Sequence, residues 1–374
     1  MTMSEVELEH EPSTKRPRAP RGTTWGLTWH GVRTVAVLEL RQRVRSTRWI
    51  VALVVWFVVV GAITLLASGA LSTIASNQGA PDNQTSNGPL LFAAVTFLVL
   101  GLGLLVTPTL ASTGINGDRN AGTLATLQVT LLTPAEITAG KLLAAWAAAC
   151  AFLVASLPFF GVALALGGTP GLAVLRVVVV VAVILASVCG IGLGFSAVTA
   201  RTAGSTVLTF LTVAALVLLT PALFGLTYPA ISSSHQVEVY TVPLSWNGDE
   251  NAQCSIQTQE RSVARTEKTW WLLGVNPFVV VADAAGTPAV SSSDGSDDDL
   301  LGAIRDGVRQ LRAGPAIPLQ ECWLEPTVPR ETSHAPVWPW GLAVNVLLGV
   351  VGFVVAVRRL RVPTRTLARG TRVA

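Results

Sequence analysis

The chain has 374 residues, of which 51% are hydrophobic and only 13% are charged, and its formal net charge is +4. Soluble globular domains usually carry about 25% charged residues, so this composition excludes an ordinary soluble domain. The positive charge does not indicate a nucleic-acid partner, because the arginines cluster beside apolar runs.

Six apolar runs are long enough to cross a hydrocarbon core of roughly 30 Å, which needs about 20 helical residues. The runs are Trp49–Leu71, Leu90–Thr113, Leu142–Leu166, Leu172–Val198, Ser205–Thr227 and Val337–Val357. They predict an all-α membrane protein with six transmembrane helices.

The arginines predict the orientation of these helices. Arg41, Arg43, Arg45 and Arg48 precede the first run, and Arg358, Arg359 and Arg361 follow the last, whereas residues 72–89 and 167–171 contain no lysine or arginine. Cytoplasmic loops carry an excess of Lys and Arg, so we expect both termini to be cytoplasmic.

The two ends of the chain are polar. Residues 1–27, with three prolines and mixed charge, predict a disordered cytoplasmic tail. Residues 28–48 mix valines and leucines with arginines, which favours a basic amphipathic helix lying in the membrane interface; a simple positive anchor for the first span is the alternative. Residues 358–374 form a basic tail attracted to the inner leaflet.

The stretch between the second and third runs, residues 114–141, is too polar for a bilayer. Leu124, Leu127 and Leu131 share one helix face, and we expect a short helix from Asp118 to about Gln128. Thr133-Pro134-Ala135-Glu136 then fits a capping box, with proline at the first helical position. The pattern predicts a cytosolic helical hairpin whose second arm continues into the third transmembrane helix.

Residues 228–336 form a large segment between the fifth and sixth runs, with 14 acidic and 7 basic residues. We expect an extracellular domain containing an amphipathic helix that begins after Asp297-Asp298-Asp299. Cys254 and Cys322 are the only cysteines outside the apolar runs. On the oxidising side of a membrane they favour a disulfide, with two free thiols as the alternative.

The sequence lacks the common motifs for nucleotide binding and zinc binding. The chain has no GxxxxGK[ST] phosphate loop and no HExxH zinc pattern, and its apolar runs contain no Asp, Glu or His. We therefore expect no catalytic, cofactor-binding or metal site and no ATPase activity in this chain. Intramembrane carboxylates or histidines usually carry coupled protons, so proton-coupled transport is disfavoured.

The central stretch resembles the signature region of ABC-2 type transporter permeases, the membrane subunits of ATP-driven exporters. The matching residues are Asp118-Arg119, Gly122-Thr123-Leu124, Leu131-Leu132-Thr133-Pro134, Glu136 and Gly140-Lys141, and Asn276-Pro277-Phe278 before the last span fits the same pattern. Asn120 stands where an acidic residue is common in that family, and the segment 228–336 is longer than usual.

The resemblance implies a bacterial plasma-membrane permease that pairs with a second permease chain, like or unlike, within membrane lipids. A separate ATP-binding subunit would carry ATP and magnesium and would dock on Asp118, Arg119, Gly122, Thr123, Leu124 and Leu127. The apolar spans, which are nearly free of ionisable groups, favour an amphiphilic or hydrophobic cargo. The alternatives are a membrane scaffold or sensor with an extracellular partner-binding domain, and an ion-coupled carrier.

Overall fold

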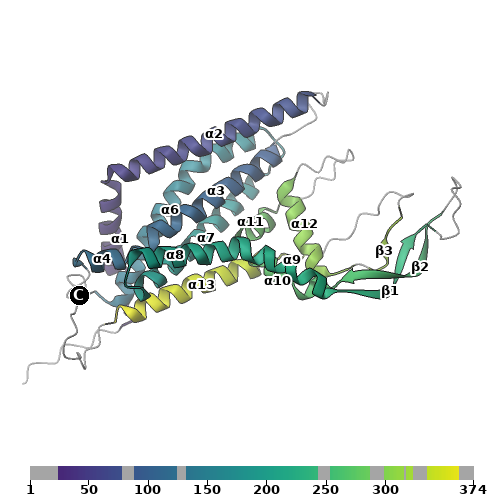
Figure 1. Ribbon diagram of the computed structural model, residues 1–374. Helices are drawn as coiled ribbons and strands as arrows, with labels where there is room; N and C mark the ends of the chain where they lie inside the picture. The colour runs from purple at the N-terminus through teal and green to yellow at the C-terminus, as the bar shows by residue number, and fades with distance from the viewer. Residues whose placement is uncertain are drawn as a thin grey trace, which may run out of the picture.

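A computed structural model describes residues 24–77, 88–123, 132–242, 253–286, 299–315, 317–322 and 335–361 of the chain. Figure 1 shows a bundle of long helices with a short helix set across one end and a β-hairpin projecting from the other. We call these the α4 end, after helix α4 (Asn116–Asn120), and the hairpin end. The terminal segments 1–23 and 362–374, and with them most of the expected tails, lie outside the described residues.

In the described part of the chain, six helical segments are long and apolar enough to cross a membrane, and they confirm the six predicted runs. Their helices are α2 (Thr47–Asn77), α3 (Gly88–Ala111), α6 (Pro134–Ala165), α7 (Gly171–Val198), α8 (Thr202–Ala214) continuing into α9 (Thr220–Ile231), and α13 (Trp338–Arg359). The protein is a multi-pass membrane protein with a mostly helical fold.

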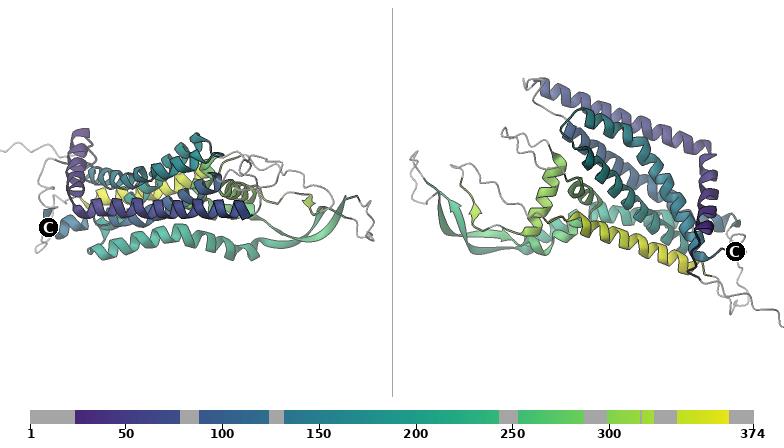
Figure 2. Two further views of the ribbon diagram at one scale, coloured as in Figure 1. Left: turned by 90° about the horizontal axis from the view of Figure 1, so that it is seen from above. Right: turned by 180° about the vertical axis from the view of Figure 1, so that it is seen from behind.

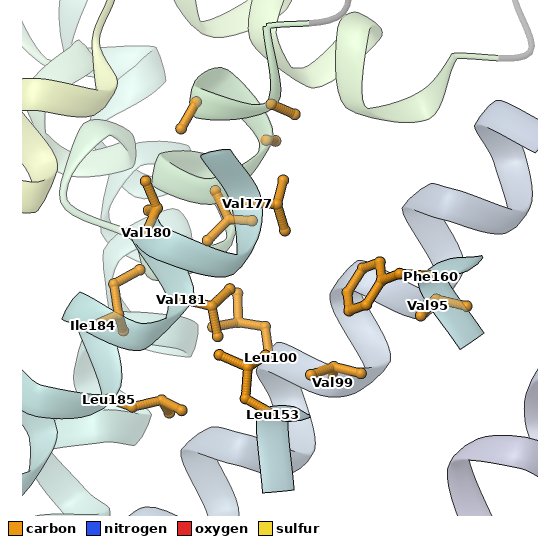
Figure 3. Close-up of a cluster of buried hydrophobic side chains, with 14 of the residues drawn as sticks. Val95, Val99, Leu100, Leu153, Phe160, Val177, Val180, Val181, Ile184 and Leu185 are labelled. Carbon is orange, nitrogen blue, oxygen red and sulfur yellow. The ribbon is translucent and has the colours of Figure 1, made fainter. Parts of the chain in front are cut away.

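The centre of the bundle is the apolar contact between α3, α6 and α7 (Figure 3). Leu100 of α3 and Val177 and Ile184 of α7 are fully buried there, and Phe160 of α6 is 1% exposed. The outermost helices are less enclosed. Only 22% of an 18-residue apolar stretch of α2 is buried, and 11% of the corresponding stretch of α8–α9, against 56% in α3. The exposed apolar faces of α2 and α8–α9 are left to lipid or to another chain.

Helices α7 and α13 pack backbone to backbone. A Cβ atom added to Gly194 would lie 2.6 Å from the Cα atom of Gly352, and Gly190 meets Gly349 in the same way. Small residues at this spacing allow such an approach.

Helix α1 (Trp29–Val44) turns sharply at Ser46 into α2 (Figure 1). It confirms the predicted helix before the first span, but several of its apolar residues pack against the protein rather than face the membrane interface. Val32, Val35 and Ala36 are buried, and Val35 packs on α6 so closely that a Cβ atom on Gly140 would lie 2.5 Å from it. Trp29 and Leu38 remain exposed.

The fifth span is irregular at its centre, where a π-helical turn, Ala215–Leu219, precedes Pro221. Proline has no N–H group, so the carbonyl of Val217 four residues earlier loses its helical donor. The Asn276 side chain replaces that donor: its Nδ2 lies 2.9 Å from the Val217 oxygen. The same side chain caps α11 (Pro277–Ala285), because its Oδ1 accepts from the Phe278 amide. The Asn-Pro-Phe motif therefore connects the interrupted fifth span to the start of α11.

The segment after α9 contains a small sheet that the sequence analysis did not anticipate. Strand β1 (Ser232–Thr241) pairs antiparallel with β2 (Ser255–Ala264), and β3 (Leu319–Gln320) pairs parallel with β1. The hairpin extends away from the bundle in both views of Figure 2. The predicted disulfide is present: Cys254 and Cys322 are bonded, with Cα atoms 6.0 Å apart, and Arg261 pairs with Glu321 beside them.

Three further helices cover the hairpin end of the bundle. Helix α10 (Trp270–Gly274) and α11 lie against the spans, and α12 (Leu300–Ala313) is the amphipathic helix predicted after the aspartates. Asp297 and Asp298 lie outside the described residues. Buried Asp283 of α11 accepts hydrogen bonds from Arg309 of α12 and from the amides of Val337 and Trp338 at the start of α13. One carboxylate thus fixes three helices.

Candidate coupling surface

Helix α4 (Asn116–Asn120) connects α3 to the stretch before α6 and lies at the α4 end of the bundle (Figure 1). The prediction of one helix from Asp118 to about Gln128 is wrong in its first half. Helix α4 ends at Asn120, and Gly122 follows with a φ of 72°, which interrupts a right-handed helix. Residues 124–131, which include Leu124, Leu127 and Leu131, lie outside the described part of the chain.

The predicted capping box starts α6. The Thr133 hydroxyl accepts from the Glu136 amide at 3.2 Å, and Glu136 Oε2 accepts from the Thr133 amide at 2.8 Å. Pro134 is the first helical residue, as predicted. Its missing N–H costs nothing there, because the first helical amides have no partner inside the helix.

Glu136 also holds the start of α1. Its Oε1 accepts from both the amide and the hydroxyl of Thr28, the N-cap residue of α1, with the amide at 2.8 Å. In return, the Thr133 hydroxyl donates to the Gly26 carbonyl. A single carboxylate that is 3% exposed therefore caps two helices and ties their N-termini together.

Lys141 forms the second connection. Its ammonium group pairs with Glu39 of α1 and with Asp118 of α4, so one cation from α6 binds a carboxylate on each neighbour. The lysine side chain is 2% exposed, whereas the two carboxylates are 21% and 26% exposed. Buried charges normally require such partners, because removal from water is costly. The cluster fixes the distance from α4 to both α1 and α6.

A network of uncharged groups holds the other side of α4. The Ser196 hydroxyl of α7 accepts from the amides of Ile115 and Asn116, at 3.1 and 3.0 Å. The buried Asn116 amide group donates to Thr199, and the Ser205 hydroxyl of α8 donates to the Ser112 carbonyl at 2.7 Å. These bonds satisfy backbone groups where the chain leaves α3. They connect α4 to the turn between α7 and α8.

The structure separates the predicted interface residues into two groups. Asp118 faces inward to Lys141, and Arg119 contacts the side chain of Asn116 at 3.5 Å. Gly122 and Thr123 are exposed, as is Asn120. Thr133 and Glu136 bind the segment at the start of α1 rather than α4, and Pro134 is the first residue of α6. The Cys254–Cys322 disulfide lies at the opposite end of the protein.

The sequence analysis missed Glu39, Asn116, Ser196 and Ser205 as members of this site. Two features of the sequence could have indicated the ion pairs of Lys141. Glu39 is an isolated acid in a basic helix, and Lys141 directly precedes a long apolar run. The hydroxyl groups have no such signal, since serine and threonine are common throughout the spans.

The arrangement can transmit a displacement. Helix α4 is only five residues long, and polar contacts join it directly to α6, α7 and α8 and, through Lys141, to α1. Asn120 to Thr123 stay exposed. A force applied to this exposed surface would move four elements together, because each contact is short and directional.

Comparison with known proteins agrees with the motif. Residues 33–261 match the family described as ABC-2 family transporter protein. No curated protein matches the chain. The matched region includes most of α1, all of α4, the Lys141 cluster and the first five spans, whereas Gly26 and Thr28 precede it. Because the matched region covers more than half of the chain, the chain belongs to the ABC-2 family of transporter membrane proteins.

Proposed function

We propose that this chain is the membrane subunit of an ATP-driven exporter, with ATP hydrolysed by a separate subunit that docks at the α4 end. The α4 end is then cytosolic, and the hairpin end lies outside. The arginines before α2 and after α13 support this orientation, since both sets lie at the α4 end. A second permease chain completes the transporter, and the apolar faces of α2 and α8–α9 are available to it.

The observation that carries the proposal is the exposed surface of Asn120 to Thr123 on a short helix fixed to four others. Closing of the ATP-binding subunits would displace α4, and the Lys141 cluster would pass the displacement to α1 and α6. Asp118 serves here as a positioning residue that holds α4, whereas the exposed backbone turn at Gly122 meets the partner. The cargo we propose is amphiphilic, because the spans lack internal carboxylates.

The test is co-purification of the tagged full chain with its ATP-binding subunit from mild detergent. Asn120→Trp adds bulk to an exposed side chain and leaves the internal contacts intact, so we expect retention of the partner to fall about tenfold, the effect of roughly 1.4 kcal/mol. Ser234→Trp, on an exposed residue of β1, is the matched control and should retain the partner.

A second variant tests transmission. Gly122→Pro cannot keep a φ of 72°, because proline is restricted to about −65°. We expect it to insert in the membrane but to lose stimulation of ATP hydrolysis by cargo. Full partner retention in Asn120→Trp together with full stimulation in Gly122→Pro would refute docking at α4. If the wild-type chain retained no ATP-binding subunit, the scaffold or carrier alternatives would be favoured instead.

A further inference from the structure

A cavity of about 620 Å³ opens between α7, α11, α12 and α13 at the hairpin end, remote from α4. Three charged side chains line it: Arg176, Asp283 and Arg309. The remainder of its wall is mainly apolar and comes from α7 and α13. Its volume is in the range of small-molecule sites, which is roughly 300–1,000 Å³.

The charges of this cavity do not cancel. Both oxygens of Asp283 are engaged, because Oδ1 accepts from Arg309 Nε at 2.6 Å and Oδ2 accepts from the amides of Val337 and Trp338. Among the described residues Arg176 has no ion-pair partner, so its positive charge is the surplus. A guanidinium group has five N–H donors in a planar arrangement that fits phosphate oxygens.

The guanidinium group of Arg176 lies close to the backbone at the end of α11. Its Nη1 would lie 2.6 Å from a Cβ atom at Gly286, the residue that ends α11 with a φ of 59°. Glycine meets both requirements, the left-handed conformation and the close approach. The guanidinium therefore lies over the C-terminal end of α11, whose carbonyls attract a cation.

The apolar wall runs from Arg176 toward the bilayer centre. Val179, Val180 and Val183 follow Arg176 on one face of α7, at spacings of three, four and seven residues. With a rise of 1.5 Å per residue, Val183 lies about 10 Å deeper than Arg176. Val183 also lines a second apolar cavity of about 490 Å³ that continues between α6, α7 and α13. A chain entering beside Arg176 thus has an apolar path along the α7–α13 contact.

We propose that this cavity binds a phospholipid with an anionic phosphate headgroup. Arg176 binds the phosphate, Arg309 adds donors beside it, and an acyl chain lies along Val179 and Val183. The geometry matches an amphiphile in a bilayer, with its charge near the rim and its chain directed inward. The site does not involve the α4 surface, and it holds whether or not an ATP-binding subunit docks there.

The experiment titrates phosphatidylglycerol into the purified full chain in neutral detergent and counts bound lipid by native mass spectrometry. Arg176→Gln should weaken the tightest binding event about tenfold, as expected for loss of a charge-assisted contact. Arg265, also exposed, lies at the same end outside the cavity. Arg265→Gln removes the same charge and should change the affinity of the tightest binding event by less than about twofold. Equal losses in the two variants would overturn the proposal, because they would indicate unspecific attraction to positive charge.

A second comparison separates lipid from soluble phosphate. Val179→Phe narrows the apolar part of the cavity and keeps both arginines. It should therefore weaken phosphatidylglycerol binding and leave the weak binding of glycerol phosphate unchanged. If glycerol phosphate binds the wild-type protein as tightly as the lipid does, the site takes a soluble anion and the lipid assignment is wrong. This comparison of lipid with glycerol phosphate does not need the Arg176→Gln variant, so it still tests the proposal if that variant fails to fold.

Discussion

Lys141 is the residue whose replacement tests the central polar cluster most directly. Lys141→Met keeps much of the apolar stem but removes the cation, which leaves Glu39 and Asp118 close together with no common partner. Removing one partner of a fully buried ion pair costs about 3–5 kcal/mol. The two carboxylates here are 21% and 26% exposed, and water can solvate them in part. We therefore expect the free energy of unfolding to fall by about 2–3 kcal/mol.

The assay is denaturant unfolding of the full chain in a fixed detergent. Lys268→Met, on an exposed lysine at the hairpin end, is the control and should change the unfolding free energy by less than about 0.5 kcal/mol. Combining Lys141→Met with Glu39→Gln and Asp118→Asn removes the unpaired charges, and we expect most of the lost stability to return. If Lys141→Met unfolds at the wild-type denaturant concentration, the three-way ion pair does not hold α4 as described.

Three other predictions concern the far half of the protein. Asn276→Leu deprives the Val217 carbonyl of its donor and should cost about 1–3 kcal/mol in the same unfolding assay; wild-type stability would show that water replaces the amide. Cys254→Ser opens a link across 68 residues, which the chain-entropy estimate values at about 4 kcal/mol, so proteolysis of the β-hairpin should accelerate while the spans stay protected. Hydrogen bonds from Arg261 lower the pKa of Glu321 below its ordinary value of 4.5. The ion pair therefore stabilises the hairpin above that value and loses this effect as the pH falls through the lowered pKa; hydrogen exchange should show opening only in acid, and Glu321→Gln should abolish the dependence.

The sequence by itself determined the six spans, because an apolar run of about 20 residues has few other stable environments. It also determined the start of α6, since a capping box depends on residues only three positions apart. The disulfide could be predicted for a different reason: Cys254 and Cys322 are the only cysteines outside the spans.

Other local features were misjudged because the deciding signal was weak. The leucine spacing after Asp118 favoured a continuous helix, but Gly122 adopts a positive φ and ends α4 early. The strands of the hairpin have few inward-facing apolar residues, chiefly Val237 and Val239, so their alternation does not stand out from a polar loop.

The tertiary structure alone decided the partners of the polar side chains. Glu136 reads locally as a cap for its own helix, yet it also caps α1, 108 residues away in the chain. Lys141 meets Glu39 across 102 residues, and Asn276 meets Val217 across 59. Hydropathy and capping are properties of neighbouring residues, whereas these contacts exist only after the helices pack, when each buried polar group must find a partner that water no longer supplies.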